Sequence, residues 1–242
     1  MTDPEGAPAD EPAPRWGLGD VALGVLAGFV LSGMLGTIGV LVTGEAEPSL
    51  LVLALSNVGL WAGLVGVALL ASRRKGRGTL AADFGLQLRP RDLGPGVAAG
   101  VATQVVLLPL LALVLRPLLG RPEVSAPARE LIELADGPAF LLLVLLVVAG
   151  APLVEELFYR GLLLRSLQRR VAAVPAVTGS ALVFGLSHQS DLPVRGLLLV
   201  WISLAAFGAV LAALAVRSGR LGPSIVAHAT FNAFTVVYVL VS

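Results

Sequence analysis

Three short stretches place polar and charged side chains within otherwise apolar sequence. They are 155-EELFYRG-161, 184-FGLSH-188 and 228-HATFN-232, and they hold both histidines of the chain. A charged side chain in the hydrocarbon of a membrane costs several kcal/mol, with estimates from about 2.5 to above 10 kcal/mol. Such residues are retained mainly where they have a partner or a function, so these stretches are the candidate site.

The first stretch combines two carboxylates and one cation in different local settings. Glu156 and Arg160 are four residues apart, on one face of a helix and in the favoured order for an ion pair. Glu155 points about 100° away from Glu156 and has no cation nearby on its own helix. A lone carboxylate in an apolar helix needs a partner on another helix. Glu156 and Arg160 can therefore neutralise one another, whereas Glu155 needs a partner elsewhere. The alternative is that all three residues form only a structural clamp.

Chain geometry brings His188 to the depth of Glu155. The turn between their helices is predicted at 169-RRVAAVP-175, midway between the two residues, so an antiparallel pair of helices places them at matching depth. Counted from Arg165 at the membrane boundary, Glu155 lies ~15 Å deep, at 1.5 Å per residue. We expect the carboxylate and the imidazole to pair.

The last stretch adds His228 and Asn232, which are four residues apart and share one helix face. If the last span begins near Leu221, His228 lies ~10 Å deep. The three stretches are therefore expected to converge on one layer of the membrane. Two further polar residues of apolar spans, Asn57 and Gln104, fit interhelical hydrogen bonds better than chemistry.

Two kinds of chemistry suit this set of side chains. A glutamate beside a histidine can take a proton from water and so make a nucleophile, and histidine and asparagine can donate hydrogen bonds to an oxyanion. These are the parts of peptide-bond hydrolysis. Glu155, His188 and His228 are also a recognised ligand set for Zn²⁺ with water in the open position. The residues leave a metal-free and a zinc-dependent reaction both open.

Long apolar helices must position these residues. Of the 242 residues 56% are hydrophobic and 14% charged, which is more apolar surface than a soluble domain of this length can hide. A helix of about 20 apolar residues crosses ~30 Å of hydrocarbon. Such runs occur near 19–43, 49–72, 95–119, 138–164, 175–190, 194–216 and 221–241. The sequence predicts an all-α polytopic membrane protein with about seven transmembrane helices (six to eight) and the active site in the cytoplasmic half of the bilayer.

The chain divides into three predicted regions. Residues 1–17 are an acidic Pro/Ala-rich tail, predicted to be disordered. Residues 18–137 hold the N-terminal transmembrane helices and a basic cytoplasmic loop, and residues 138–242 hold the catalytic core. The chain has no cysteine, which excludes disulfides and thiolate metal sites. It also has no Gly-rich phosphate loop and no HExxH zinc helix.

Basic residues indicate the orientation, because they favour the cytoplasmic side. With the N-terminus inside, twelve basic residues fall in inside segments and four in outside segments. The inside set is Arg15, six residues of the loop 73–94, Arg165, Arg169, Arg170, Arg217 and Arg220; the outside set is Arg116, Arg121, Arg129 and Arg195. We expect a multi-pass protein of the plasma membrane with a cytoplasmic N-terminus. The short fifth span either crosses fully or is re-entrant, and a re-entrant segment would place the C-terminus inside.

The motifs EExxxR, FxxxH and HxxxN, in this order on successive late spans, resemble those of the CPBP family of intramembrane proteases. This family includes the CAAX prenyl endopeptidases and bacterial ABI-type proteins. The resemblance covers roughly 138–235, and 83-DFGLQLRP-90 also resembles the loop ahead of the family's core. It implies an all-α membrane fold with the site open to the cytosol. It further implies Glu155 as general base with His188 as its partner, His228 and Asn232 as oxyanion donors, and Glu156 and Arg160 as supports.

The predicted function is that of an intramembrane endopeptidase, metallo- or glutamate-type, acting on membrane-associated or lipid-anchored substrates. Its partners are then a membrane peptide or protein and the lipid bilayer, with no nucleic acid. No cofactor is certain, and Zn²⁺ is the one the residues could hold. Two other functions fit the same residues: a proton-coupled transporter with Glu155 and the histidines as a relay, and a non-catalytic membrane immunity or scaffold protein. The internal repeats typical of many transporters are not evident.

Overall fold

The computed structural model describes residues 13–44, 49–135 and 137–241. In these residues all regular structure is helical, and six helices are long and apolar enough to cross a membrane. They span Leu18–Thr43, Leu50–Lys75, Pro90–Leu119, Pro138–Gln168, Val194–Ser218 and Gly222–Val241. The predicted all-α polytopic fold is confirmed, with a seventh, shorter helix in place of the fifth span.

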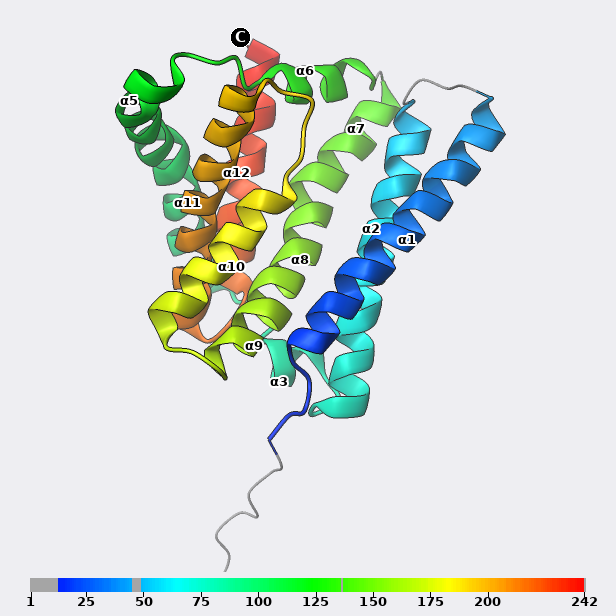
Figure 1. The fold of residues 1–242 in the computed structure, drawn as a ribbon, viewed down its shortest axis with the longest axis vertical. Coiled ribbons are helices and arrows are strands. Elements are labelled where there is room, and N and C mark those ends of the chain that lie inside the picture. Colours follow the sequence, from blue (N-terminus) through cyan, green and yellow to red (C-terminus); the bar gives the residue numbers. More distant parts are fainter. Residues whose placement is uncertain (1–12, 45–48, 136, 242) are drawn as a thin grey trace, which may run out of the picture.

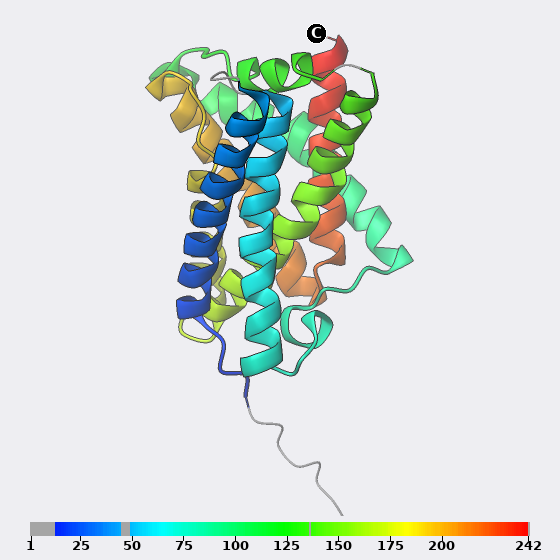
Figure 2. The same ribbon diagram turned by 90° about the vertical axis from the view of Figure 1, so that its right-hand side faces the viewer.

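The helices form one bundle with two distinct ends (Figure 1). α1 (Leu18–Thr43) and α2 (Leu50–Lys75) pair along one side. One end, which we call the basic end, carries α3 (Leu80–Phe84) and α9 (Leu164–Gln168). The opposite end carries α6 (Ala126–Glu133) and the C-terminus, and we call it the α6 end. Figure 2, turned by 90°, shows the same separation, with the start of α1 at the basic end.

The predicted span 175–190 crosses the bundle in an unusual way. Its helix, α10 (Ala173–Ser187), has only 15 residues and stops partway along the bundle (Figure 1). Residues 188–193 then run without helical structure to the α6 end, where α11 (Val194–Ser218) begins. Extended chain of this length covers up to ~20 Å. The re-entrant alternative is therefore wrong, and α12 (Gly222–Val241) ends at the opposite end of the bundle from the start of α1.

Two long helices contain π-helical turns near the candidate site. The helix Pro138–Gln168 is built from α7 (Pro138–Leu145), η3 (Leu146–Gly150), α8 (Ala151–Glu155), η4 (Glu156–Leu163) and α9. The helix that begins at Pro90 contains α4 (Leu93–Ala102), η2 (Thr103–Leu107) and α5 (Leu108–Leu119). π-helical turns are rare and occur frequently at functional sites. Here one of them starts directly after Glu155.

The basic end is closed by a packed core. Phe84, Leu162, Leu164 and Leu221 are at most 1% exposed, and the backbone N–H of Leu221 donates to the carbonyl of Gly85 at 2.8 Å. The loop with α3 thus seals the ends of the C-terminal helices. This core fixes the depth at which the polar layer above it lies.

The N-terminal segment is attached to the same end. Residues 1–12 of the predicted tail lie outside the described residues. Trp16, the last tail residue but one, is buried; its indole donates to Asp83 Oδ1 at 3.1 Å, and the guanidinium of Arg169 lies over its ring at 5.0 Å. The ordered fold therefore begins before residue 18.

Candidate active site

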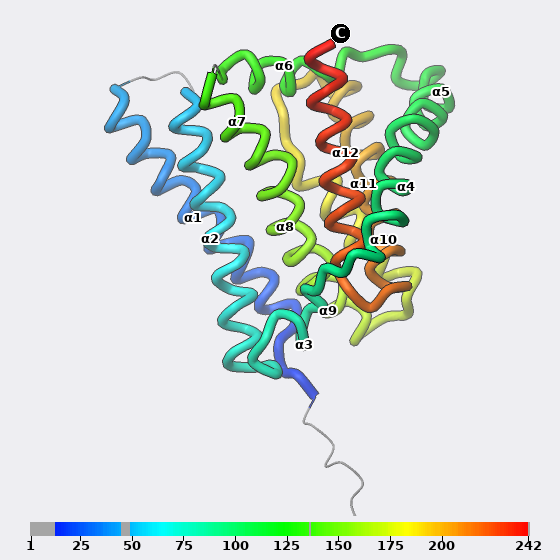
Figure 3. Tube along the Cα trace, turned by 180° about the vertical axis from the view of Figure 1, so that it is seen from behind, coloured from blue at the N-terminus to red at the C-terminus, as the bar shows by residue number. Residues whose placement is uncertain are grey.

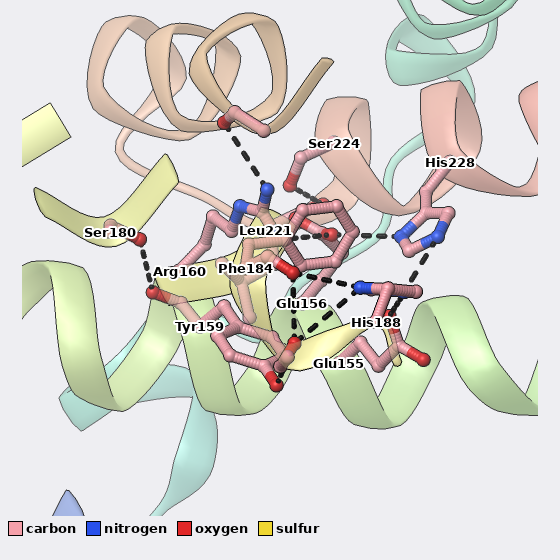
Figure 4. A network of polar contacts seen from close by, with 12 residues as sticks. Glu155, Glu156, Tyr159, Arg160, Ser180, Phe184, His188, Leu221, Ser224 and His228 are labelled. Atoms are coloured by element: carbon pink, nitrogen blue, oxygen red, sulfur yellow. Dashed lines mark hydrogen bonds and ion pairs between the residues drawn. The ribbon is translucent and has the colours of Figure 1, made fainter. Parts of the chain in front are cut away.

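Glu156 is the centre of a fully buried polar cluster. Its Oε1 accepts a hydrogen bond from Arg160 Nη1 at 3.0 Å and contacts His228 Nδ1 at 2.9 Å. Both side chains of the ion pair are 0% exposed. Arg160 also donates to the carbonyl of Gly208 on α11 at 3.2 Å. The predicted pair is thus present, and it ties η4 to α11 and α12 as well as closing its own helical turn (Figure 4).

Glu155 faces both histidines, as the predicted depths require. Its Oε2 lies 3.8 Å from His188 Nε2 and 3.9 Å from His228 Nε2. None of the described residues hydrogen-bonds to this buried oxygen. The side chain of Glu155 is 20% exposed and that of His188 33%, whereas that of His228 is only 4% exposed. The side chain of Glu155 is therefore partly exposed, but its Oε2 is buried and lies beyond hydrogen-bond distance of both imidazoles.

Hydrogen bonds fix how the two imidazoles present their nitrogens. His188 Nδ1 lies 2.7 Å from the carbonyl oxygen of Phe184, which can only accept, so Nδ1 carries the proton. His228 Nδ1 faces a carboxylate oxygen of Glu156 that also accepts from Arg160, so this nitrogen donates. In the neutral form both Nε2 atoms then carry lone pairs, and both point toward Glu155. A group that bridges them to the carboxylate must donate hydrogens or be a cation.

Asn232 lies one helical turn above His228, in the wall of an apolar cavity of about 210 Å³ that also contains Glu155 and His188. Its Nδ2 donates to the carbonyl of Val147 in η3 at 2.8 Å. An amide NH₂ has two hydrogens, so one remains for a ligand. The structure thus brings together all four predicted site residues, with Glu156 and Arg160 beneath them.

Three residues near the site received no role from the sequence. Phe184 lies at the centre of the cluster, with its ring centroid 4.7 Å from that of His188 and 5.6 Å from that of His228, and the Arg160 guanidinium lies over it at 4.2 Å. Tyr159 donates to Ser187 Oγ at 2.8 Å, and Ser187 Oγ donates to the Phe184 carbonyl and lies 3.4 Å from His188 Nδ1. The helix ends at Ser187 and the backbone turns there, which brings the Ser187 hydroxyl near the ring of His188. The sequence did contain a signal for two of these residues. Phe184 is the first residue of the FxxxH motif, and Tyr159 lies one helical turn after Glu155, so their spacing from His188 and Glu155 could have indicated them.

The two other intramembrane polar residues behave differently from one another. Gln104 in η2 donates to the Phe231 carbonyl at 3.1 Å and to Thr235 Oγ1 at 2.7 Å, so its predicted interhelical role is confirmed. Asn57 instead donates to the carbonyl of Leu53 in its own helix at 3.0 Å.

The donor types of Glu155, His188 and His228 suit zinc, because each imidazole has its Nδ1 hydrogen-bonded and its Nε2 free. The distances between these donor atoms do not suit zinc. Glu155 Oε2 lies 3.8 Å from His188 Nε2 and 3.9 Å from His228 Nε2, whereas two ligand atoms that each lie ~2.0–2.2 Å from a tetrahedral zinc are closer to one another. Within the described part of the chain, no group of three or more His, Asp or Glu side chains could hold a metal ion in this arrangement. Zinc binding by Glu155, His188 and His228 therefore stays a prediction.

Fold and site together define a polytopic helical membrane protein with a buried carboxylate–imidazole site in its C-terminal half. Residues 137–234 match the family model described as Type II CAAX prenyl endopeptidase Rce1-like. The match contains all three motifs and confirms the resemblance predicted from them, over almost the same residues. No curated protein and no solved structure matches the chain. This segment is therefore similar to the CAAX-type endopeptidases of membranes.

Proposed function

We propose that the protein is an intramembrane endopeptidase that cleaves membrane-associated or lipid-anchored substrates with a water activated by Glu155. The observation that carries this proposal is the convergence of two imidazole Nε2 atoms on Glu155 Oε2, at 3.8 and 3.9 Å. A water molecule in this space donates one hydrogen to the carboxylate and one to an imidazole. Its oxygen lone pair is then free to attack a carbonyl carbon.

The reaction follows from these positions. Glu155 takes a proton from the water as the oxygen bonds to the scissile carbonyl carbon. The resulting oxyanion accepts hydrogen bonds from Asn232 and from His228 in its protonated form. The C–N bond then breaks as the proton held by Glu155 passes to the leaving amine. His188 accepts the second hydrogen of the water through Nε2 and so orients the water for attack.

Two side chains are placed to donate to the oxyanion. The Nδ1 of His228 is occupied by Glu156 at 2.9 Å, which leaves its Nε2 directed toward the reacting atoms. The amide of Asn232 donates one hydrogen to the Val147 carbonyl and has a second one available.

Cleavage of membrane peptides by the reconstituted protein tests the proposal. Wild type, Glu155→Gln and His188→Ala are compared on a library of membrane-inserted peptides, with products identified by mass spectrometry. We expect wild type to cut peptides that both variants leave intact. Full activity in Glu155→Gln would refute the assignment of the base. A wild type that is folded but cuts nothing that the variants spare would remove the protease function.

Two additions to this assay separate the other possibilities. Exhaustive chelation tests for a metal, since activity that survives it excludes a required zinc. Proton uptake into the same vesicles tests for a transporter, because a relay through Glu155 moves protons across the bilayer and is lost in Glu155→Gln. A protein that neither cleaves nor moves protons would fit the immunity or scaffold function.

A further inference from the structure

Gln104 bonds to α12 on both sides of Asn232 in the sequence. It lies in the π-helical turn η2, directly after α4, which runs beside α12 when the bundle is seen from behind (Figure 3). Its Nε2 donates to the Phe231 carbonyl at 3.1 Å and to Thr235 Oγ1 at 2.7 Å. A backbone carbonyl can only accept, so the amide nitrogen must face it, with one hydrogen for each acceptor. Two hydrogen bonds thus join η2 to the segment of α12 that carries Asn232.

The helix with Gln104 meets α12 at regular steps. Three of its residues follow one another at intervals of four and so share one face: Gly96, Gly100 and Gln104. A Cβ on Gly96 would lie 3.0 Å from the Pro223 carbonyl oxygen, and one on Gly100 would lie 2.6 Å from that of Ala227. The third carbonyl in this row is that of Phe231, again four residues on, and it is the one that Gln104 binds. The two helices therefore pack in register, row against row.

Of these three contacts, the one at Gln104 is directional. The glycines let the two backbones approach closely, but a close approach by itself leaves α12 able to turn about its own axis. The hydrogen bonds of Gln104 depend on angle as well as distance, so they fix this rotation next to Asn232. On its other side Asn232 donates to the Val147 carbonyl in η3 at 2.8 Å. The direction of its second amide hydrogen is thus set from two helices.

His228, one turn earlier on α12, is held in a different way. Its Nδ1 lies 2.9 Å from Glu156 Oε1, and the side chain of Glu156 is 0% exposed and paired with Arg160. A small rotation of α12 at Gln104 should therefore move Asn232 more than His228.

We propose that Gln104 is a positioning residue of the reaction, which holds α12 so that the free amide hydrogen of Asn232 faces the oxyanion. The proposal rests on the proposed function, in which Asn232 donates to that oxyanion. Gln104 lines an adjoining cavity of about 300 Å³ and not the one that contains Glu155. It therefore acts through α12 and not by contact with the reacting atoms.

The variant Gln104→Met removes the amide and keeps a flexible side chain of similar length. The Thr235 hydroxyl still donates to the Phe231 carbonyl at 3.1 Å in its absence. No buried backbone group loses its last partner, so we expect this variant to fold.

The asparagines of the chain allow a test without any activity. There are only two, Asn57 and Asn232, so protein with ¹⁵N in its asparagine side chains gives one pair of NH₂ signals for each in an NMR spectrum in detergent. Asn57→Leu removes one pair and thereby assigns the other. We expect Gln104→Met to shift the signals of Asn232 and to leave those of Asn57 in place. Unchanged Asn232 signals would overturn the proposal.

A double-mutant cycle on peptide cleavage tests the role in the reaction. We expect Gln104→Met to lower kcat by ~10- to 100-fold with KM unchanged, since misplacing a catalytic group by about 1 Å costs up to ~100-fold. In an Asn232→Ala background the same change should lower kcat by less than about twofold, because the group that Gln104 positions is gone. Equal factors in both backgrounds would overturn the proposal, since a purely structural role does not depend on Asn232.

Asn57→Leu is the matched control for this cycle. It also removes an amide from an apolar helix, but that amide donates to the Leu53 carbonyl of its own helix, so kcat should stay at the wild-type value. Shifted Asn232 signals in a protein that cleaves nothing would remove the proposed function and leave the control of Asn232 by Gln104 standing. Unshifted signals in a protein that does cleave would remove the inference alone, so the two failures are distinguishable.

Discussion

At the scale of single residues, the two adjacent glutamates have different neighbours and therefore different tasks. Glu156 is enclosed and hydrogen-bonded to a cation and an imidazole. Glu155 is partly exposed, and Oε2 has no hydrogen-bond partner among the described residues. We therefore propose that Glu156 supports the site and that Glu155 reacts.

Replacing each glutamate by glutamine should separate these tasks. Glu156→Gln keeps the shape but leaves Arg160 as an unpaired buried charge, which costs about 3–5 kcal/mol. We expect this variant to unfold at a much lower temperature than wild type in detergent, as measured by tryptophan fluorescence. Glu155→Gln serves as the control, because it should unfold close to wild type while losing cleavage. Equal destabilisation of both variants would contradict the proposal that Glu156, and not Glu155, supports the fold of the site.

Tyr159 acts on the site through Ser187, which lies between it and His188. Tyr159→Phe keeps the ring packed against Phe184, whose centroid is 5.2 Å away, and removes the hydrogen bond to Ser187. A single hydrogen bond contributes about 0.5–1.5 kcal/mol, so we expect kcat to fall by at most about tenfold with KM unchanged. A change in KM alone would argue instead for contact with substrate.

At the scale of elements, close helix packing depends on glycines where two backbones meet. A Cβ on Gly63 of α2 would lie 2.2 Å from the backbone N of Gly28 on α1. Helices in membranes associate through such small residues, because lipid supplies no hydrophobic force between them. The α1–α2 pair in turn packs against η4 and so supports the site from one side.

Alanine substitutions on α2 test this contact. Gly63→Ala forces α1 and α2 apart and should destabilise the protein by about 1–3 kcal/mol. Gly66→Ala is the matched control on the same helix, since a Cβ there meets no atom within 4 Å; it should be neutral or stabilising by up to ~1 kcal/mol. Thermal unfolding in detergent measures both. Similar stabilities for the two variants would show that the close approach is unimportant.

At the scale of the whole molecule, Asp83 joins segments that are far apart in the sequence. Its carboxylate accepts hydrogen bonds from the Ser72 hydroxyl at 2.6 Å, from the Trp16 indole at 3.1 Å and from the backbone N–H of Arg77 at 2.9 Å. Burial by itself would raise the pKa of Asp83, but these hydrogen bonds outweigh it and lower the pKa below its ordinary value of 3.8. The ionised form therefore stabilises the basic end.

The sign of this shift predicts how stability depends on pH. A carboxylate whose pKa is lowered in the folded state stabilises the fold fully above its unfolded value, and loses that contribution as pH falls through the folded value. We expect wild type to be more stable than Asp83→Asn at pH 7, with the difference shrinking below about pH 4. Unfolding temperatures of both proteins from pH 7 to pH 3 measure it. A difference that stays constant down to pH 3 would count against a lowered pKa.

The sequence by itself determined the class of fold and the candidate residues of the site. Runs of apolar residues specify membrane helices because hydrocarbon cannot solvate the backbone, and intramembrane charges stand out because they are costly. Helical periodicity paired Glu156 with Arg160, and the position of the turn brought Glu155 level with His188. The match over residues 137–234 confirms the resemblance that the three motifs indicated.

Only the tertiary structure decided how these residues are connected and which side chains surround them. Helical periodicity describes one helix at a time. It therefore could not show that His228 and Arg160 both contact the same oxygen of Glu156. It also could not show that the Nε2 atoms of both histidines face Glu155. The crossing of residues 188–193 is also a tertiary outcome, because non-helical backbone at this depth is tolerated only against other protein segments; the indole of Trp201 donates to the His188 carbonyl there at 3.0 Å. The apolar cavity beside Glu155 is also a tertiary outcome, because its walls come from helices distant in the chain, among them α6, α7 and α12.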